Sequence, residues 1–168
     1  MKQMQHTFPP GRMANHNSSS HKKMIPANPA TLQFCWHIRV GMFRNVDPCT
    51  LKAYADFFYT TYLDRHLKAQ EDLLQRHNDL PVWITKNVLA SQRRLRRLFE
   101  SPKDVYRSLS QIEDTLERHV RLEQKILFGA LLQLASDTAG EEKLYRSFYH
   151  AVPAKKLELW KDRFWSLD

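Results

Sequence analysis

The chain has 168 residues and a formal net charge of +8, and 42% of its residues are hydrophobic. This length and composition predict one globular domain with a hydrophobic core. No apolar run approaches the roughly 20 residues that span a bilayer, and the N-terminus lacks the pattern of a secretory signal. We therefore expect a cytoplasmic protein with no membrane segment. Its two cysteines, Cys35 and Cys49, form neither a disulfide framework nor a zinc-binding spacing and are expected to be free thiols.

The excess of positive charge does not by itself predict a nucleic-acid partner. Four arginines lie within residues 92–97, where they flank Leu95, as on the solvent side of an amphipathic helix. Neither a zinc-finger spacing nor the aromatic pattern of RNA-binding strands accompanies them. We do not expect nucleic acid to be bound.

Residues 1 to about 28 contain Pro9-Pro10-Gly11 and a run of asparagine and serine, with little periodicity. Such a composition is typical of an extended arm with little regular structure. The domain proper is expected to occupy residues 29–168.

From residue 29 onward, apolar residues recur every three or four positions, which predicts helices rather than strands. Asp47-Pro48, Pro81 and Ser101-Pro102 mark the breaks between them. Four helices are expected at about 30–45, 48–77, 81–100 and 103–136, followed by two shorter ones at about 141–150 and 154–166. The predicted fold is all-α: an up-down four-helix bundle over about 30–136, with an N-terminal arm and one or two extra C-terminal helices.

Three aromatic residues lie near the C-terminus: Trp160, Phe164 and Trp165. If these side chains do not pack on their own chain, they offer an interface for a homo-oligomer.

A histidine and a carboxylate interrupt the apolar face of the fourth predicted helix. The face runs through residues three or four apart: Leu109, Ile112, Leu116, His119, Glu123, Leu127, Ala130 and Leu134. Burying an imidazole and a carboxylate costs several kcal/mol unless both find partners. A bound cation would satisfy both, so this face predicts half of a metal site.

Two more histidines, His37 and His66, occupy expected core positions on the first and second helices. Inward side chains of facing helices can converge on one metal ion. Glu123 lies about 40° from His119 around the helix, whereas Glu71 lies about 140° from His66. We expect the metal ligands to be His37, His66, His119 and Glu123, with Glu71 as a fifth candidate.

The order of these residues resembles the hemerythrin-like, histidine-histidine-glutamate cation-binding family. Residues 115–131 are similar to its fourth-helix motif, in which a histidine is followed by one or two acids and Leu-Phe. Residues 66–74 resemble its second-helix motif, and His37 matches its first-helix histidine. The resemblance covers roughly residues 30–135. It implies a four-helix bundle that holds a non-haem di-iron centre through histidines on all four helices and two bridging carboxylates.

The chain departs from the family pattern at the third helix. Gln92 stands where the resemblance implies a histidine, and no histidine lies between residues 78 and 118. Gln70 occupies the favoured acid position of the second helix. Because neutral amides are poor ligands for iron, Gln70 and Gln92 are weaker candidates for the site. A complete di-iron centre is therefore not expected.

Two functional hypotheses follow. In the first, the protein binds one metal ion, iron or zinc, and serves in O2, NO or redox sensing or in iron handling. In the second, the bundle is a metal-free binding or regulatory protein, in which His119–Glu123 and Gln92–His66 are buried hydrogen-bonded pairs. A di-iron oxygen-using enzyme is disfavoured because no Glu-x-x-His pair is in register, and no catalytic residue is assigned.

Overall fold

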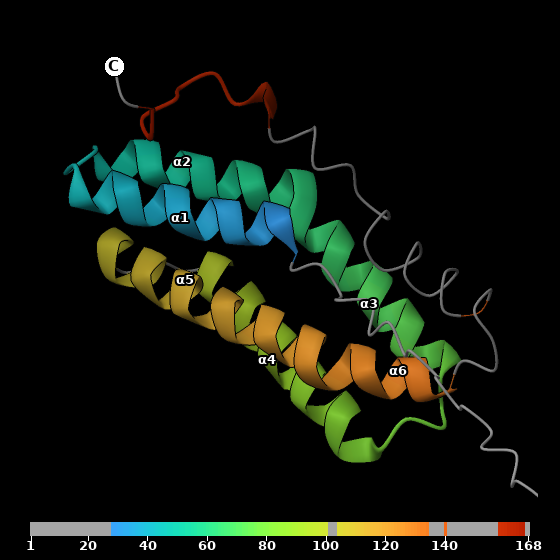
Figure 1. The fold of residues 1–168 in the computed structure, drawn as a ribbon. Coiled ribbons are helices and arrows are strands. Elements are labelled where there is room, and N and C mark those ends of the chain that lie inside the picture. Colours follow the sequence, from blue (N-terminus) through green and yellow to red (C-terminus); the bar gives the residue numbers. More distant parts are fainter. Residues whose placement is uncertain (1–27, 101–103, 135–139, 141–157, 167–168) are drawn as a thin grey trace, which may run out of the picture.

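The computed structural model describes residues 28–100, 104–134, 140 and 158–166. Four helical segments follow one another, and the described residues contain no strand (Figure 1). They are, in chain order, α1 (Pro29–Phe43); α2 (Pro48–Phe58), the π-helical turn η1 (Tyr59–Leu63) and α3 (Asp64–Arg76); α4 (Val82–Glu100); and α5 (Val105–Leu122), the π-helical turn η2 (Glu123–Leu127) and α6 (Phe128–Leu134). The predicted all-α class and the order of the four helices are confirmed. The arm at 1–27 and the helix expected at 141–150 lie outside the described residues.

The helices begin where side chains cap them. Asn28 Oδ1 accepts a hydrogen bond from the Thr31 amide at 3.2 Å, and Asp47 Oδ2 accepts one from the Thr50 amide at 2.9 Å. Each cap is followed by proline, whose fixed φ suits the first helical position. The helix α1 ends at Phe43, earlier than predicted, because Asn45 adopts the left-handed region with φ 54°.

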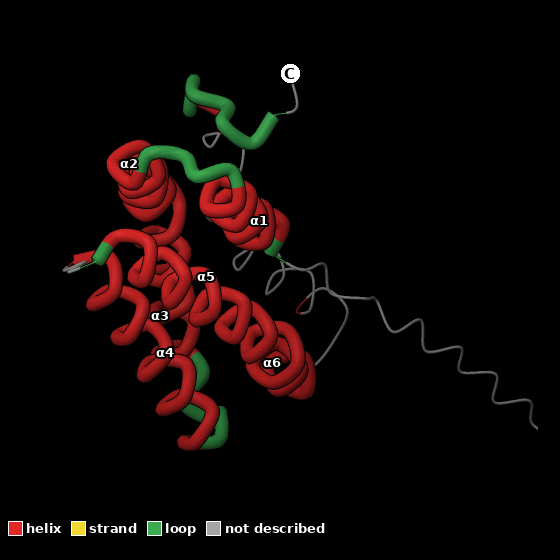
Figure 2. The backbone as a smooth tube through the Cα atoms, turned by 90° about the vertical axis from the view of Figure 1, so that its left-hand side faces the viewer, coloured by secondary structure: helices red, strands yellow, loops and turns green. Residues whose placement is uncertain are grey.

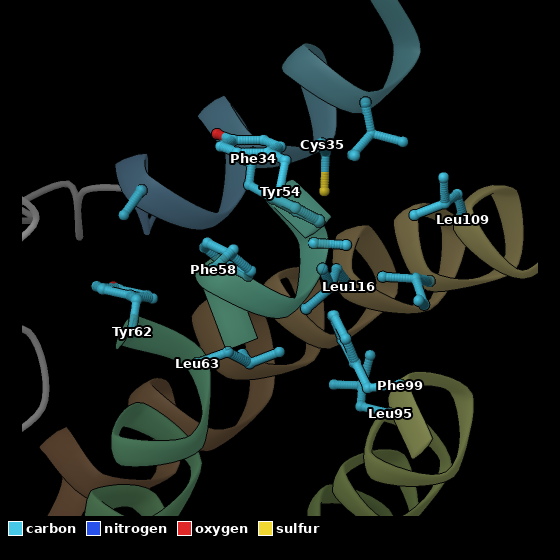
Figure 3. Close-up of a cluster of buried hydrophobic side chains, with 14 of the residues drawn as sticks. Phe34, Cys35, Tyr54, Phe58, Tyr62, Leu63, Leu95, Phe99, Leu109 and Leu116 are labelled. Carbon is cyan, nitrogen blue, oxygen red and sulfur yellow. The ribbon is translucent and has the colours of Figure 1, made fainter. Parts of the chain in front are cut away.

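Two hydrophobic clusters fill the interior, with a polar layer between them. The first cluster lies among α1, α2, η1 and the facing parts of α4 and α5 (Figure 3). The second lies among α3, α4, η2 and α6. On α3, the buried Gln70 lies between Leu67 of the first cluster and Leu73 of the second, and on α4 the buried Gln92 lies between Leu95 and Val88. The helix α5 packs against both α1 and α4 and lies between them in Figure 2.

The apolar face of the fourth helical segment changes register at η2. A π-helical turn contains an additional residue, so the residues after it are rotated relative to an uninterrupted α-helix. Leu127, Phe128 and Leu131 are buried, whereas Leu134 is 40% exposed. Ala130 is partly buried against the second cluster, as predicted, but the prediction that Leu134 continues the buried face is wrong.

The C-terminal segment is not the helix that was predicted at 154–166. Its described part, residues 158–166, has one short 3₁₀ turn and otherwise non-helical backbone. Trp160, Phe164 and Trp165 pack against the first hydrophobic cluster. These three aromatic side chains are thus partly covered by their own chain, although the segment is not helical. The condition under which they would offer an interface for a homo-oligomer, that they do not pack on their own chain, is not met.

In the described part of the chain, no helix has the length and apolar character needed to cross a membrane.

Candidate metal centre

The polar layer brings together side chains from three helical segments. His66 and Gln70 come from α3, Gln92 from α4, His119 from α5 and Glu123 from the first position of η2. Each of these side chains is almost completely buried. Because apolar residues flank the layer on both sides, its polar groups must satisfy one another or a bound ion.

Both imidazoles converge on one oxygen of Glu123. His66 Nε2 donates a hydrogen bond to Glu123 Oε1 at 3.0 Å, and His119 Nε2 lies 3.1 Å from the same oxygen. His66 and Glu123 are 57 positions apart in the sequence, so the packing of the second helical segment against the fourth creates this cluster.

The two histidines also determine the charge of the carboxyl group. Burial alone would raise the pKa of Glu123 by disfavouring its charged form. Electrostatic attraction from His66 and His119, together with the hydrogen bond from His66, outweighs burial and holds the pKa of Glu123 well below its usual value. Glu123 is therefore a carboxylate at neutral pH, and it supplies negative charge to the interior.

Three polar atoms of the layer have no hydrogen-bond partner. They are Glu123 Oε2, Gln92 Oε1 and His119 Nε2, the last of which is not aligned for a hydrogen bond although it lies 3.1 Å from Glu123 Oε1. The other ring nitrogen of His119, Nδ1, lies 3.0 Å from Ser91 Oγ on α4. A hydrogen bond at one ring nitrogen orients the other one, as is typical of histidines that bind metals.

A pair of glutamines closes the layer on the side of α4. Gln92 Nε2 donates to Gln70 Oε1 at 2.5 Å, and Gln70 Nε2 donates to Glu123 Oε1 at 2.8 Å. The hydrogen-bonded pair expected between Gln92 and His66 is not formed, because Gln70 lies one turn after His66 on α3 and occupies the position facing Gln92. Gln92 instead also donates to the Leu67 carbonyl at 3.4 Å.

Asn28 is a residue of the layer that the sequence analysis assigned to the arm. Its Nδ2 lies 3.4 Å from His66 Nε2, and its Oδ1 accepts a hydrogen bond from Tyr62 Oη at 2.7 Å. The Asn28-Pro29 pair is the same helix-start signal as Asp47-Pro48 and could have placed Asn28 at the beginning of α1. Ser91 carried no such signal.

The structure does not bring His37 to this cluster. Its Nδ1 lies 2.6 Å from Tyr54 Oη. Tyr54 and His66 are twelve positions apart on one helical segment, which corresponds to about 18 Å of rise. His37 therefore lies in the first hydrophobic cluster rather than in the polar layer.

Glu71 is also outside the polar layer. Its Oε1 pairs with Arg96 Nη1 on α4 at 2.7 Å, and its side chain is partly exposed. The five-residue offset from His66 turns Glu71 towards α4, while the four-residue offset turns Gln70 inward.

The donor set suits a transition metal. Two imidazoles and a carboxylate are ligands that iron and zinc both accept. With bonds of about 2.1 Å, adjacent ligands of a tetrahedral zinc ion are about 3.4 Å apart, whereas each imidazole Nε2 lies 3.0 or 3.1 Å from Glu123 Oε1, which is an ordinary hydrogen-bond distance. Among the described residues, however, no group of three or more His, Cys, Asp or Glu side chains is arranged so that it could hold a metal ion. Gln70, whose amide donates to Glu123 Oε1, would have to turn to admit an ion.

Comparisons with protein-family models, with curated proteins and with solved structures gave no match to this chain.

Proposed function

We propose that this protein is a hemerythrin-like four-helix bundle that binds one iron or zinc ion through His66, His119 and Glu123. The observation that carries the proposal is the convergence of two buried imidazoles on a buried carboxylate whose second oxygen has no hydrogen-bond partner. The resemblance of residues 30–135 to the histidine-histidine-glutamate family supports it. His37 and Glu71 are left out of the ligand set because each has another partner.

The two π-helical turns add support. The turn η1 ends three residues before His66, and η2 begins at Glu123. Single π-helical turns inside α-helices occur frequently at functional sites, because they redirect side chains that a regular helix would place elsewhere.

When bound, the ion would supply Lewis-acid or redox chemistry, as needed for sensing O2 or NO, for redox sensing or for iron handling. The residues of this chain have separate roles. His66, His119 and Glu123 hold the ion, Ser91 orients the His119 ring, and the surrounding apolar clusters exclude water. Gln70 and Gln92 are neutral, so they limit the negative charge of the site and favour one ion over two.

Metal analysis of the full chain purified without chelator tests the proposal. About one equivalent of iron or zinc per chain is expected. Added to the protein after its metal has been removed, Fe(II) or Zn(II) at a hundred times its Kd should stabilise it by about 2.7 kcal/mol, which corresponds to a rise in Tm of about 5–10 °C. A content well below one equivalent, together with an unchanged Tm, would overturn the proposal.

Glu123→Gln is the matching variant, and it should lose the metal. Glu117→Gln is its control, because Glu117 lies on the same helix but is partly exposed and pairs with Arg39. Anomalous scattering at the polar layer would locate the ion. Metal retained at wild-type occupancy by Glu123→Gln would exclude this ligand set.

The hydrogen bond from Gln70 to Glu123 favours a second candidate, a metal-free binding or regulatory protein. In that case the double substitution His119→Leu, Glu123→Leu should be tolerated or even stabilising, because both members of a buried polar pair are replaced by apolar side chains. If His119 is a ligand, the same substitution should abolish metal binding and lower the stability of the metal-supplemented protein.

A further inference from the structure

A continuous row of aromatic rings runs from the polar layer into the first hydrophobic cluster. Figure 3 shows the four rings of this aromatic row, which are Tyr62, Phe58, Phe34 and Tyr54. The His66 and Tyr62 rings are stacked with centroids 5.8 Å apart, and Tyr62 is 5.6 Å from Phe58. Phe58 is stacked on Phe34 at 4.0 Å, and Phe34 is 5.5 Å from Tyr54. No pair of neighbouring rings in the row is separated by an aliphatic side chain.

At its far end the row meets a buried hydrogen-bonded pair and then the surface. Tyr54 Oη and His37 Nδ1 are 2.6 Å apart. The His37 ring is stacked on Trp165 at 3.7 Å and lies 5.3 Å from the ring of Trp36. Trp36 is 50% exposed. The rings therefore connect the polar layer to a tryptophan that solvent reaches.

The Tyr54–His37 pair has the chemistry of a redox-active tyrosine. A phenol that loses an electron becomes a strong acid, so its oxidation is easiest when a base is already hydrogen-bonded to the hydroxyl. Burial lowers the pKa of His37 to about 4, so His37 is neutral near pH 7 and its Nδ1 can accept the proton. Burial raises the pKa of Tyr54 above its ordinary value, so the phenol does not ionise beforehand.

We propose that Tyr54 and His37 form a redox-active pair, and that single electrons pass between the polar layer and Trp36 along the aromatic row, tunnelling across Phe58 and Phe34, which are not themselves oxidised. A one-electron oxidant takes one electron from Tyr54. The Oη–H bond breaks, and the proton forms an N–H bond at His37 Nδ1. The products are a neutral tyrosyl radical and an imidazolium. A one-electron reductant of the ascorbate class returns the electron, and His37 returns the proton to Oη.

Flash photolysis tests the pair in protein that has no metal ion bound in the polar layer. The full chain is mixed with a ruthenium tris-bipyridyl complex and persulfate, which produce a one-electron oxidant in solution. We expect a tyrosyl radical in the electron paramagnetic resonance spectrum that is largely lost in Tyr54→Phe. The control Tyr59→Phe should retain it, because Tyr59 is half-buried next to Phe99 and is not in the row. A signal unchanged by Tyr54→Phe would overturn the proposal.

A second measurement addresses the proton and requires no variant to fold. In wild-type protein, electron-nuclear double resonance should show a proton coupled to the radical that disappears in D2O, because the proton now on His37 is exchangeable. His37→Gln, which can keep a hydrogen bond but is a much weaker base, should lower the radical yield. The absence of an exchangeable coupling in the wild-type protein would also overturn the proposal.

The end of the route at the polar layer rests on the metal site proposed above. Protein loaded with Fe(II) and treated with hydrogen peroxide as oxidant should form the same radical. If the protein binds no metal, the photolysis result still decides whether Tyr54 is redox-active. If metal binds and photolysis yields no Tyr54 radical, only the present proposal fails.

Discussion

The polar side chains of the interior divide into two groups with different electrostatics. Glu123 is a buried carboxylate whose charge is held by two histidines. His37 lies in apolar surroundings, where its partner is the neutral hydroxyl of Tyr54. Removing a charge from water is costly unless an opposite charge compensates it. Two histidines therefore stabilise the buried charge of Glu123, whereas His37, in apolar surroundings, stays neutral itself.

The neutral state of His37 predicts a pH dependence of stability. Burial lowers its pKa from 6.5 to about 4 in the folded protein. Between these values the unfolded chain takes up a proton that the folded chain does not, so stability should fall as the pH is lowered from 6.5 towards 4. The expected loss by pH 4 is about 3 kcal/mol, since the shift spans about 2.5 pKa units and each unit is worth about 1.4 kcal/mol. Above pH 6.5 this contribution is constant.

Urea unfolding between pH 4 and 7 measures this effect. His37→Gln should show a smaller loss of stability on acidification than the wild type, whereas His77→Gln, at the end of α3, should not. Equal slopes for the wild type and His37→Gln would contradict the assignment.

At the scale of the elements, a glycine in α1 allows α2 and the C-terminal segment to pack closely against that helix. A Cβ atom at Gly41 of α1 would lie 2.8 Å from Phe164 Cε2 and would also overlap Leu51 of α2. At Gly129 of α6 a Cβ atom would have no neighbour within 4 Å. The two glycines therefore have different roles, although both lie in helices.

Alanine substitutions should separate these roles. Gly41→Ala is expected to destabilise the protein by about 1–3 kcal/mol, because the side chains that it overlaps must move. Gly129→Ala should stabilise it by about 0.5–1 kcal/mol, because alanine loses less backbone entropy in a helix. Thermal and urea unfolding of both variants measure the difference. A Gly41→Ala variant as stable as Gly129→Ala would show that the C-terminal segment does not pack at this point.

At the scale of the whole molecule, the C-terminal segment packs against the outside of the first hydrophobic cluster. Arg44 Nη1, just after α1, donates hydrogen bonds to the Phe164 and Ser166 carbonyls at 3.0 and 2.7 Å. Trp165 is stacked on His37, and Trp160 contacts the rings of Tyr54 and Phe57 on α2. Residues more than a hundred positions apart are thus joined around α1 and α2.

Trp165→Ala should destabilise the protein by about 2 kcal/mol, less than the loss of a fully buried tryptophan, because the ring is only partly buried. Trp83→Ala is the control: Trp83 lies on α4, is 54% exposed, and should change stability by less than about 0.5 kcal/mol. Unfolding followed by circular dichroism avoids the loss of a fluorescent reporter. Equal effects of the two substitutions would mean that residues 158–166 do not stabilise α1 and α2.

Local patterns were sufficient to predict the four helices and part of the polar layer. The spacing of apolar residues identified the inward faces, and this placed His66, His119 and Glu123 at buried positions. The angular offset from the preceding histidine correctly predicted that Glu123 points inward and that Glu71 does not. These features depend on residues within one or two helical turns, which a sequence displays directly.

Other features of the site depend on contacts between distant residues. Asn28 reaches His66 only because α1 begins beside α3, and Ser91 reaches His119 only because α4 packs on α5. His37 seemed equivalent to the other two histidines, but it meets Tyr54 and Trp165 instead. The π-helical turn η2 rotates the residues of α6 about the helix axis, so a constant α-helical period could not predict which of them are buried.

By itself, the sequence determined the all-helical architecture, the positions of the breaks and the burial of three histidines and a glutamate, because helical periodicity and capping act over a few residues. The tertiary structure decided which of these buried groups meet, since that depends on where each helix lies along its neighbours. It placed His66, His119 and Glu123 together, left His37 with the aromatic residues, and packed a non-helical C-terminal segment over α1 and α2.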